Sequence, residues 1–340
     1  MDPTARFVRD KDAPVSSKPE RRVLITGGAG FLGINAALHL IKEGWHISLL
    51  DNLSRPGTER NLKWLLTRFP NRIAFFKEDV RNAAALAEHV RGQDAVLHLA
   101  GQVAVTTSLM DPGTDFDVNA RGTLNMLEAV RLHNHDVPFV FSSTNKVYGK
   151  LGHNNSACKE TQPLDFHSPY GCSKGAADQY VRDYARCFDM NTVVLRQSCI
   201  YGAHQYGTED QGWVAHFVHS ILKDRPLTIY GDGTQVRDLL DARDLSALYS
   251  TVIDKIAITR GEIYNVGGGP KNQRNLLEVI DQIGELTSRK PQFSFADWRE
   301  GDQAYYVSDV AKAKEQLGWE PRIEFDRGLR DLIAWAESVD

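Results

Sequence analysis

Short runs of β-branched, leucine and aromatic residues alternate with longer amphipathic stretches from Arg22 to about Tyr201. The runs expected as strands are Val23–Thr26, His46–Leu50, Ile73–Phe76, Ala95–Ala100, Pro138–Ser143 and Thr192–Arg196. The stretches between them have helical periodicity, as in Leu32–Lys42, Leu86–Arg91 and Gly122–Leu132. Continuous apolar strands alternating with helices are typical of a parallel sheet covered on both faces. With right-handed crossovers, the pattern predicts an α/β protein with a doubly wound parallel sheet.

The pattern changes after about Tyr201, where polar and glycine-rich loops separate shorter strands and helices. We therefore expect an NAD-binding Rossmann-like domain over residues 21–200 and a smaller mixed α/β substrate lobe over 201–340. Strands of that lobe can return to the first domain. Residues 1–20 are charged, contain proline and lack an apolar signal core, which indicates a disordered leader or a cloning remnant.

The composition limits the class of protein. Hydrophobic residues make up 42% and charged residues 25% of the 340 residues, and the formal net charge is −4. That balance is ordinary for a soluble globular chain and argues against nucleic-acid binding. No apolar run of about 18 residues is present, so we expect no membrane span. The four cysteines lack CxxC spacing, which favours a reduced, cytoplasmic protein without a structural metal.

A glycine-rich turn follows the first expected strand. In VLITGGAGFLG, Gly27, Gly30 and Gly33 are spaced by three residues between a strand and a helix. Such glycines let backbone N–H groups approach a pyrophosphate at a helix N-terminus. Asp51 ends the second strand, 18 residues after Gly33. A carboxylate there accepts from a ribose 2′-OH and repels a 2′-phosphate, which favours NAD over NADP, although the nearby Arg55 pulls the other way.

Two further strand ends carry residues that can reach a ligand. Asp79 and Val80 follow the third strand, and Leu99, Ala100 and Gly101 follow the fourth. Ligands of open α/β sheets bind outside the carboxyl ends of the strands. We therefore expect these residues to line the same cofactor site.

Tyr170 and Lys174 are four residues apart in a segment that resembles a helix start, with Ser168 as N-cap and Pro169 as the first helical residue. A tyrosine pKa of about 10 is too high for a base at neutral pH, and lowering it by three units requires about 4 kcal/mol. One lysine charge at about 4 Å and an effective dielectric near 20 has that magnitude. We therefore expect Tyr170 to act as the base and Lys174 to lower its pKa.

The polar segment FSSTNKVYG begins at the end of the fifth expected strand and continues beyond it. The hydroxyl of Thr144 stands at the strand end, where it can hydrogen-bond the same substrate oxygen as Tyr170. Asn145 and Lys146 follow, and neither is a carboxylate. We interpret this segment as one wall of an active site rather than as a self-satisfied turn.

These motifs resemble those of a known protein superfamily. GGAGFLG, Asp51, SST and YGCSK resemble the extended short-chain dehydrogenase/reductase superfamily, specifically its nucleotide-sugar epimerases and dehydratases. DNLSR, HLAGQVAVTTS, SSTNKVYG and DQGWV are similar to the C2 epimerases of CDP-hexoses within that superfamily. The resemblance implies that bound NAD⁺ oxidises C2 of a CDP-sugar and that the hydride returns to the other face.

The resemblance also implies which residues form the site. The catalytic residues would be Thr144, Tyr170 and Lys174. Residues expected to bind NAD are Gly27, Gly30, Phe31, Leu32, Asp51, Asn52, Ser54, Arg55, Asp79, Val80, Leu99, Ala100, Gly101, Asn119, Ser142, Tyr170, Lys174 and Gln197. Those expected to contact the nucleotide-sugar are Gln102, Thr144, Asn145, Lys146, Cys199, Arg237 and Arg299. The family further implies a homodimer or homotetramer, formed through segments such as Gly122–Leu132 and Ala176–Cys187.

Three other functions stay open. A 4,6-dehydratase needs an acid and a base besides the tyrosine, and similar dehydratases have Asp-Glu where this chain has Asn145 and Lys146. A UDP-sugar 4-epimerase has nearly the same catalytic set, so only the pose of the sugar separates C4 from C2 chemistry. An NAD-binding regulatory protein would be expected to have lost Tyr170, Lys174 or Thr144, and all three are present.

Overall fold

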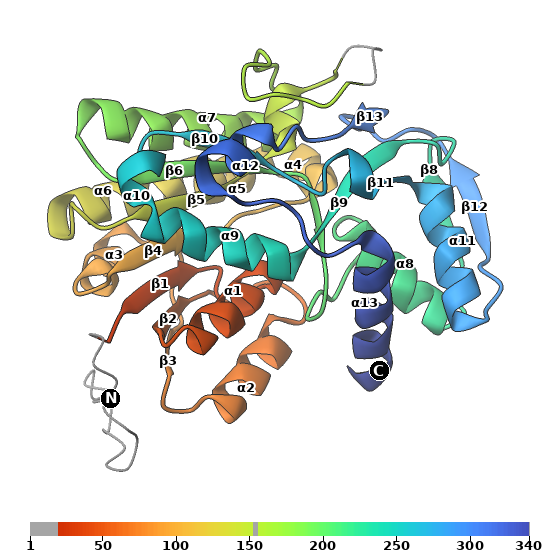
Figure 1. Cartoon of the computed structure of the whole chain (residues 1–340), viewed down its shortest axis with the longest axis horizontal. Helices are drawn as coiled ribbons and strands as arrows, with labels where there is room; N and C mark the ends of the chain where they lie inside the picture. The colour runs from red at the N-terminus through yellow and green to blue at the C-terminus, as the bar shows by residue number, and fades with distance from the viewer. Residues whose placement is uncertain (1–19, 152–155, 340) are drawn as a thin grey trace.

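The computed structural model describes residues 20–151 and 156–339, so the predicted leader lies, except for Glu20, outside the described residues. Its main feature is a seven-stranded sheet, in which every neighbouring pair is parallel (Figure 1). The order across the sheet is β3-β2-β1-β4-β5-β6-β10, which confirms the predicted doubly wound sheet. Its strands are β1 (Arg22–Thr26), β2 (His46–Leu50), β3 (Ile73–Phe76), β4 (Ala95–His98), β5 (Phe139–Thr144), β6 (Thr192–Gln197) and β10 (Ile263–Val266).

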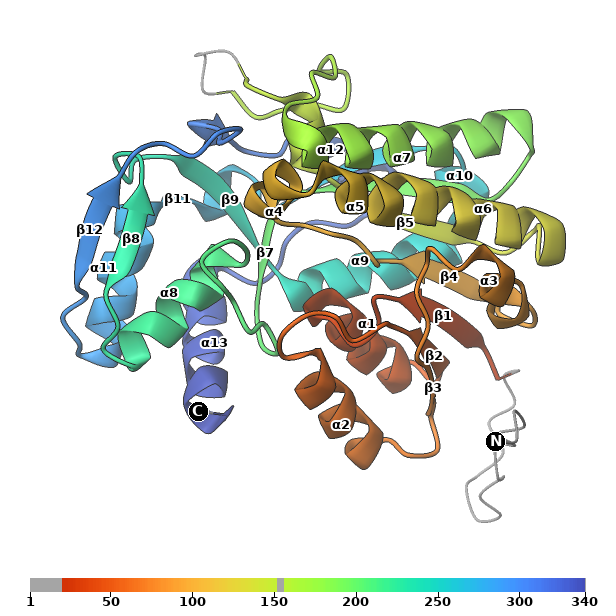
Figure 2. The same cartoon turned by 180° about the vertical axis from the view of Figure 1, so that it is seen from behind.

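Helices cover both faces of this sheet (Figure 2). One face packs against α1 (Phe31–Lys42), α2 (Thr58–Arg68), α9 (Ala242–Asp254) and α12 (Ala311–Leu317). The other packs against α3 (Ala83–Val90), α6 (Gly122–His133) and α7 (Ser168–Cys187). Because both faces of the sheet are covered, burial does not alternate along its strands, as in β5, where all six residues are buried.

The seventh strand comes from the second half of the chain. β10 pairs with β6 in parallel register, with Ile263 opposite Val194. Its four residues, IYNV, are too short and mixed for sequence patterning to separate them from a loop. The division at residue 200 stays a prediction, and residues beyond it supply both β10 and the covering helix α9.

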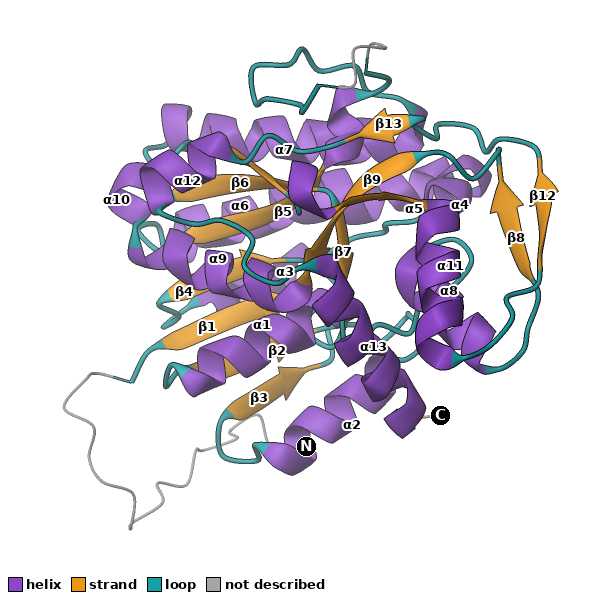
Figure 3. Ribbon diagram, turned by 45° about the vertical axis from the view of Figure 1, so that its right-hand side comes forward, coloured by secondary structure: helices purple, strands orange, loops and turns teal. Residues whose placement is uncertain are grey.

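The rest of the second half forms a smaller lobe beside the carboxyl ends of the strands (Figure 3). β9 (Val236–Asp241) pairs with β7 (Cys199–Tyr201), β11 (Gln273–Asn275) and β13 (Tyr305–Tyr306), while β8 (Leu227–Tyr230) pairs with β12 (Phe293–Ala296). Three helices, α8 (Trp213–Leu222), α11 (Leu276–Thr287) and α13 (Phe325–Val339), enclose a separate apolar core.

Short helices complete the connections. They are α4 (Val105–Met110), α5 (Pro112–Phe116), a π-helical turn (Asp117–Arg121), a 3₁₀ turn (Asn145–Tyr148), α10 (Ile256–Thr259) and a second 3₁₀ turn (Pro270–Asn272). Within residues 20–151 and 156–339, no helix has the length and apolar character needed to cross a membrane.

Candidate active site

Two adjoining cavities lie where the carboxyl ends of the strands face the smaller lobe. One has a volume of about 530 Å³ and is lined by the strand ends of the first half of the chain. The other has a volume of about 370 Å³ and lies between β5, β6 and the smaller lobe. Phe31, Leu32, Leu99, Gln205 and Gln211 line both, so a ligand in one cavity can touch a ligand in the other. We call the first the cofactor cavity and the second the substrate cavity.

Most of the residues predicted to bind NAD line the cofactor cavity. They are Gly27, Gly30, Phe31, Leu32, Asp51, Asn52, Ser54, Arg55, Asp79, Val80, Leu99, Ala100 and Gly101. Ser142, Tyr170, Lys174 and Gln197 line the substrate cavity instead, next to the shared wall. Their position at the junction is where the reactive end of a cofactor would meet a sugar.

The glycine turn shapes the floor of the cofactor cavity. Gly27 has φ +66°, and a Cβ added there would stand 2.8 Å from Ala100 N. Gly30 precedes α1 as its N-cap and gives no side-chain hydrogen bond to the helix. The first N–H groups of α1 therefore remain available to an anionic group, and a pyrophosphate fits this turn.

Asp51 lies at the cofactor cavity as predicted. Its carboxylate accepts hydrogen bonds from Ala29 N at 3.1 Å and from Leu53 N at 2.8 Å, while burial raises its pKa. Arg55 does more than place a positive charge near Asp51. Its guanidinium donates a hydrogen bond to the side chain of Gln211 in the smaller lobe. Arg55 thus links the two lobes across the cavity.

Segment 203–211 of the smaller lobe forms the opposite wall of the cofactor cavity. Two buried amides hold its backbone: Asn35 Nδ2 donates to Ala203 O at 2.9 Å, and Asn61 Nδ2 donates to His204 O at 3.1 Å. Sequence reasoning missed this wall, because only the fold brings α1 and α2 against it. A bound dinucleotide would be enclosed between the strand ends and this segment.

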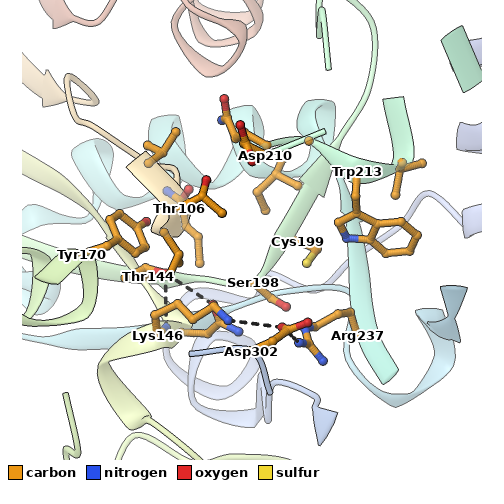
Figure 4. Close-up of a pocket in the computed structure, with 18 of the residues that line it drawn as sticks. Thr106, Thr144, Lys146, Tyr170, Ser198, Cys199, Asp210, Trp213, Arg237 and Asp302 are labelled. Carbon is orange, nitrogen blue, oxygen red and sulfur yellow. Dashed lines mark hydrogen bonds and ion pairs between the residues drawn. The ribbon is translucent and has the colours of Figure 1, made fainter. Parts of the chain in front are cut away.

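The three predicted catalytic side chains come together in the substrate cavity, and Figure 4 shows Tyr170 beside Thr144. Thr144 ends β5, and Tyr170 and Lys174 lie in the first two turns of α7. Ser168 has φ +72° and accepts from Gly171 N at 3.3 Å, which is the contact expected of an N-cap. The strand end and the helix start therefore place all three groups at one point.

Lys174 is fully enclosed. Its Nζ donates to Ser142 O at 2.5 Å and lies 4.2 Å from the centre of the Phe141 ring. Burial lowers its pKa to about 7, against the opposing effect of Asp178 and Asp115. The ammonium is thus directed at the end of β5 and at the floor of the site.

The expected effect of Lys174 on Tyr170 is wrong for the protein without cofactor. Burial raises the pKa of Tyr170 to about 12, opposed by a hydrogen bond with Thr144 and by the charge of Arg55. The simple Coulomb estimate failed because it left out the desolvation of the phenolate. The estimate also assumed that the Lys174 ammonium directly approaches the Tyr170 phenol, whereas Lys174 Nζ donates a hydrogen bond to Ser142 O.

Two predicted contact residues lie away from the positions expected for them. Asn119 is buried under α7 and lines neither cavity, and its Nδ2 donates to Asp115 Oδ1 at 3.2 Å and Ser173 Oγ at 3.1 Å. Gln102 lines the cofactor cavity and not the substrate cavity, because its Nε2 donates to Ala104 O at 2.8 Å and to Asp115. Both amides support the site from below.

The wall after Thr144 consists of an amide and an ammonium. Thr144 Oγ1 donates to Asn145 Oδ1 at 3.3 Å, and Asn145 Nδ2 donates to Gln303 Oε1 at 3.3 Å. Lys146 Nζ donates to Gly301 O at 3.1 Å, and burial lowers the pKa of Lys146 to about 8. Asn145 therefore contacts the Thr144 turn.

A charged cluster forms the far wall of the substrate cavity (Figure 4). Asp302 Oδ1 lies 2.7 Å from Arg237 Nη2 and 3.6 Å from Lys146 Nζ, so one carboxylate serves two cations. The remaining positive charge suits a diphosphate. Cys199 lines the same wall, and burial raises the pKa of its thiol, which disfavours a nucleophilic role.

Arg299 lines the substrate cavity beside Tyr230. Its guanidinium lies 3.7 Å from the centre of the Tyr230 ring and 3.3 Å from Glu209 Oε1. Sequence reasoning identified Arg299 but missed Tyr230, which ends β8, and Glu209 and Asp302, which come from two separate loops. A charged or aromatic residue in a loop gives no local signal of the cavity it will line.

Metal chemistry receives no support from the part of the chain that the structure describes. In residues 20–151 and 156–339, no group of three or more His, Cys, Asp or Glu side chains is arranged to hold a metal ion.

Comparisons with known proteins agree with this geometry. The family model described as GDP-mannose 4,6 dehydratase matches residues 24–332. CDP-paratose 2-epimerase of Salmonella typhi is 40% identical over 94% of this chain and 100% of its own. A dTDP-glucose 4,6-dehydratase of Neisseria meningitidis is 34% identical over 93% of each chain. The solved UDP-glucose 4-epimerase of Thermus thermophilus, in complex with NAD, has a TM-score of 0.84 and 31% identity over 94% of this chain and 100% of its own.

Proposed function

Because the chain belongs to the extended short-chain dehydrogenases/reductases, in the family described as GDP-mannose 4,6 dehydratase, we propose that it is an NAD-dependent nucleotide-sugar epimerase. The reaction is inversion of C2 of a CDP-hexose: CDP-paratose to CDP-tyvelose, or a related CDP-sugar such as CDP-glucose. The choice of C2 and of CDP rests on the similarity to CDP-paratose 2-epimerase over nearly the whole chain.

NAD is the cofactor that the site fits. The open N-terminus of α1 suits a pyrophosphate, and Asp51 suits a ribose 2′-OH. When bound, NAD accepts a hydride from the sugar, returns it, and adds positive charge near the phenol. Lys174 supports the site from the floor, and the roof formed by segment 203–211 keeps water from the cavity.

The chain's own residues handle the proton. Tyr170 takes the proton of the C2 hydroxyl as C2 loses its hydride, and it gives the proton back when the 2-keto sugar is reduced from the other face. Thr144, hydrogen-bonded to Tyr170, can hold the same oxygen. Atoms and electrons are the same before and after, so the net change is the configuration of C2 alone.

The wall formed by Thr144, Asn145 and Lys146 supports epimerisation over dehydration as the reaction. Elimination of water from a keto sugar needs an acid and a base beside the reacting carbons, and the dehydratases that the chain resembles are expected to supply them as an Asp-Glu pair. Asn145 is an amide committed to Thr144 and Gln303, and Lys146 is an ammonium held near Asp302. The keto intermediate therefore has one favourable course, which is reduction.

Two or more copies of the chain are expected to associate. The exposed apolar side chains of the helices on one face include Met110, Phe116, Leu132 and Tyr180, which are 78%, 49%, 60% and 51% exposed. They lie on α4 to α7, and α6 and α7 contain the two segments through which the family implies association (Figure 2). An apolar patch of this kind supports a dimer or tetramer, and sedimentation analysis measures which one forms.

The test is a product analysis with CDP-paratose, CDP-glucose and UDP-glucose. CDP-sugar carrying deuterium at C2 should give product inverted at C2 that keeps the deuterium, as seen by NMR. Tyr170→Phe should keep NAD and lose turnover. Inversion at C4 would replace the proposal with a 4-epimerase, and a 4-keto-6-deoxy product would replace it with a dehydratase.

A further inference from the structure

A buried carboxylate lies directly beneath the start of α7. Asp115, on α5, is 1% exposed and lines neither cavity. Its Oδ2 accepts from Ser173 Oγ at 2.5 Å, and its Oδ1 accepts from Gln102 Nε2 at 3.1 Å and Asn119 Nδ2 at 3.2 Å. All three donors are neutral, so the hydrogen bonds stabilise the negative charge without cancelling it.

A second buried carboxylate nearby differs in its charge balance. Asp178 accepts from Arg196 Nε at 2.9 Å and Arg196 Nη2 at 2.8 Å, so a guanidinium matches its charge. Among the described residues, no comparable ion pair is formed by Asp115. A buried charge without a cation at contact distance acts on the nearest cation available.

The ammonium of Lys174 is a cation whose charge acts on Asp115. Ser173, which bonds Asp115, is the neighbour of Lys174 in α7. The position of a Cβ on Gly101 would lie 3.8 Å from Lys174 Nζ and 3.0 Å from Asn119 Oδ1. The Lys174 ammonium and the Asn119 amide, whose Nδ2 donates to Asp115, therefore both lie close to Gly101.

We propose that Asp115 is a positioning residue of the active site, whose carboxylate serves as the counter-charge that keeps Lys174 protonated beside Tyr170. The proposal also explains why the side-chain amides of Gln102 and Asn119 are directed at Asp115: their hydrogen bonds favour the charged carboxylate and oppose the burial that raises the pKa of Asp115. The part that concerns turnover rests on the proposed epimerase function, while the electrostatic part does not.

Other charged groups face the same two side chains. Asp178 on α7 and His98 on β4 face Lys174, and Arg55 faces Tyr170 from the loop after β2. Burial lowers the pKa of His98 to about 3, so its ring is neutral at working pH. Asp178 raises the pKa of Lys174 and is itself paired with Arg196, whereas Asp115 acts on Lys174 in the same direction without an ion pair of its own among the described residues.

The decisive variant is Asp115→Asn, which removes the charge and keeps the shape. The new amide can donate to Ser173 Oγ, and the Ser173 hydroxyl can turn to Tyr170 O, 3.2 Å away. Loss of a negative charge disfavours the ammonium of Lys174 and favours the phenolate of Tyr170. Both pKa values therefore fall, and both limbs of the pH–rate profile of the NAD-loaded enzyme should move to lower pH by about one unit.

Asp117→Asn is the matched control, because Asp117 is 47% exposed and pairs with Arg121 on the surface. It should leave both limbs in place. Asp115→Glu, which keeps the charge, should hold the limbs near those of the original chain. If Asp115→Asn leaves the limbs where Asp117→Asn leaves them, the proposal is overturned.

A second measurement separates this proposal from the epimerase function. The phenolate absorbance of the NAD-loaded protein is titrated with pH, and the curve of a Tyr170→Phe variant is subtracted. Asp115→Asn should lower the pKa obtained for Tyr170 by about one unit whether or not a sugar is turned over. An absent shift refutes the role of Asp115, whereas a shift without turnover refutes the epimerase function alone. Asp115→Ser carries the same expectation if Asp115→Asn does not fold.

Discussion

Lys174→Met should make the cofactor-free protein more stable at acidic and neutral pH. The lysine is buried against the Phe141 ring, where an ammonium is costly and a thioether is not. Its pKa falls from the ordinary 10.5 to about 7, which corresponds to about 5 kcal/mol. The substitution also leaves Ser142 O without its donor, a loss of about 2 kcal/mol. The net gain expected at pH 6 is therefore about 3 kcal/mol.

The sign of the pH dependence follows from the two pKa values. Below pH 7 the lysine is protonated in the folded and the unfolded chain, so the original protein carries the whole cost of the buried charge. Between pH 7 and pH 10.5 the unfolded chain binds more protons than the folded one, so the stability of the original protein rises with pH. The advantage of Lys174→Met should therefore vanish at about pH 9, and above it the variant should be the less stable protein by up to about 2 kcal/mol, because only the lost donor to Ser142 O remains.

Urea unfolding at several pH values measures this difference, with Lys63→Met as control. Lys63 is exposed on α2, so its replacement should change the free energy of unfolding by less than about 0.5 kcal/mol at every pH. The reasoning is refuted if Lys174→Met is less stable than the original protein at pH 6, or if the difference does not change with pH.

Three further substitutions test other parts of the structure. Gly27→Ala places a Cβ against the backbone of Ala100 in a left-handed turn, so a loss of about 1–3 kcal/mol and of NAD retention in gel filtration is expected; full retention would contradict the tight turn. Asp178→Asn leaves the guanidinium of Arg196, 2% exposed, without its carboxylate, and the free energy of unfolding should fall by about 3–5 kcal/mol in urea titration. Asn145→Asp replaces a buried donated N–H by an acceptor, so the same titration at pH 8 should show a loss of about 1–3 kcal/mol, and no loss would show that the amide is dispensable.

The sequence predicts what is encoded locally. Six of the seven strands of the large sheet were identified because each is a continuous apolar run between turn residues. The glycine turn, Asp51 and the four-residue spacing of Tyr170 and Lys174 were recognisable because the chemistry requires residues close together in the chain. All of these lie at the cavities as expected.

What the sequence did not reveal depends on distant parts of the chain. Asp302 pairs with Arg237 of β9 and lies near Lys146 of the 3₁₀ turn, and these three residues are more than sixty positions apart in the chain, so no window of sequence contains the cluster. The Gln102 side chain is directed at Asp115, which lies on α5. Asn119, on the π-helical turn that follows, donates to the same carboxylate. The pKa of Tyr170 depends on burial, a property that spacing alone does not give.

The pairing of β10 with β6 has a consequence for how the chain is made. Until Ile263–Val266 has left the ribosome, the backbone N–H and C=O groups along the outer edge of β6 have no strand to pair with. An open edge next to an apolar surface invites association with other nascent chains. A gene shortened after residue 200 would keep the glycine turn and the catalytic helix, yet it would leave that edge permanently open. We therefore expect such a fragment to aggregate, even though it contains the whole dinucleotide fingerprint.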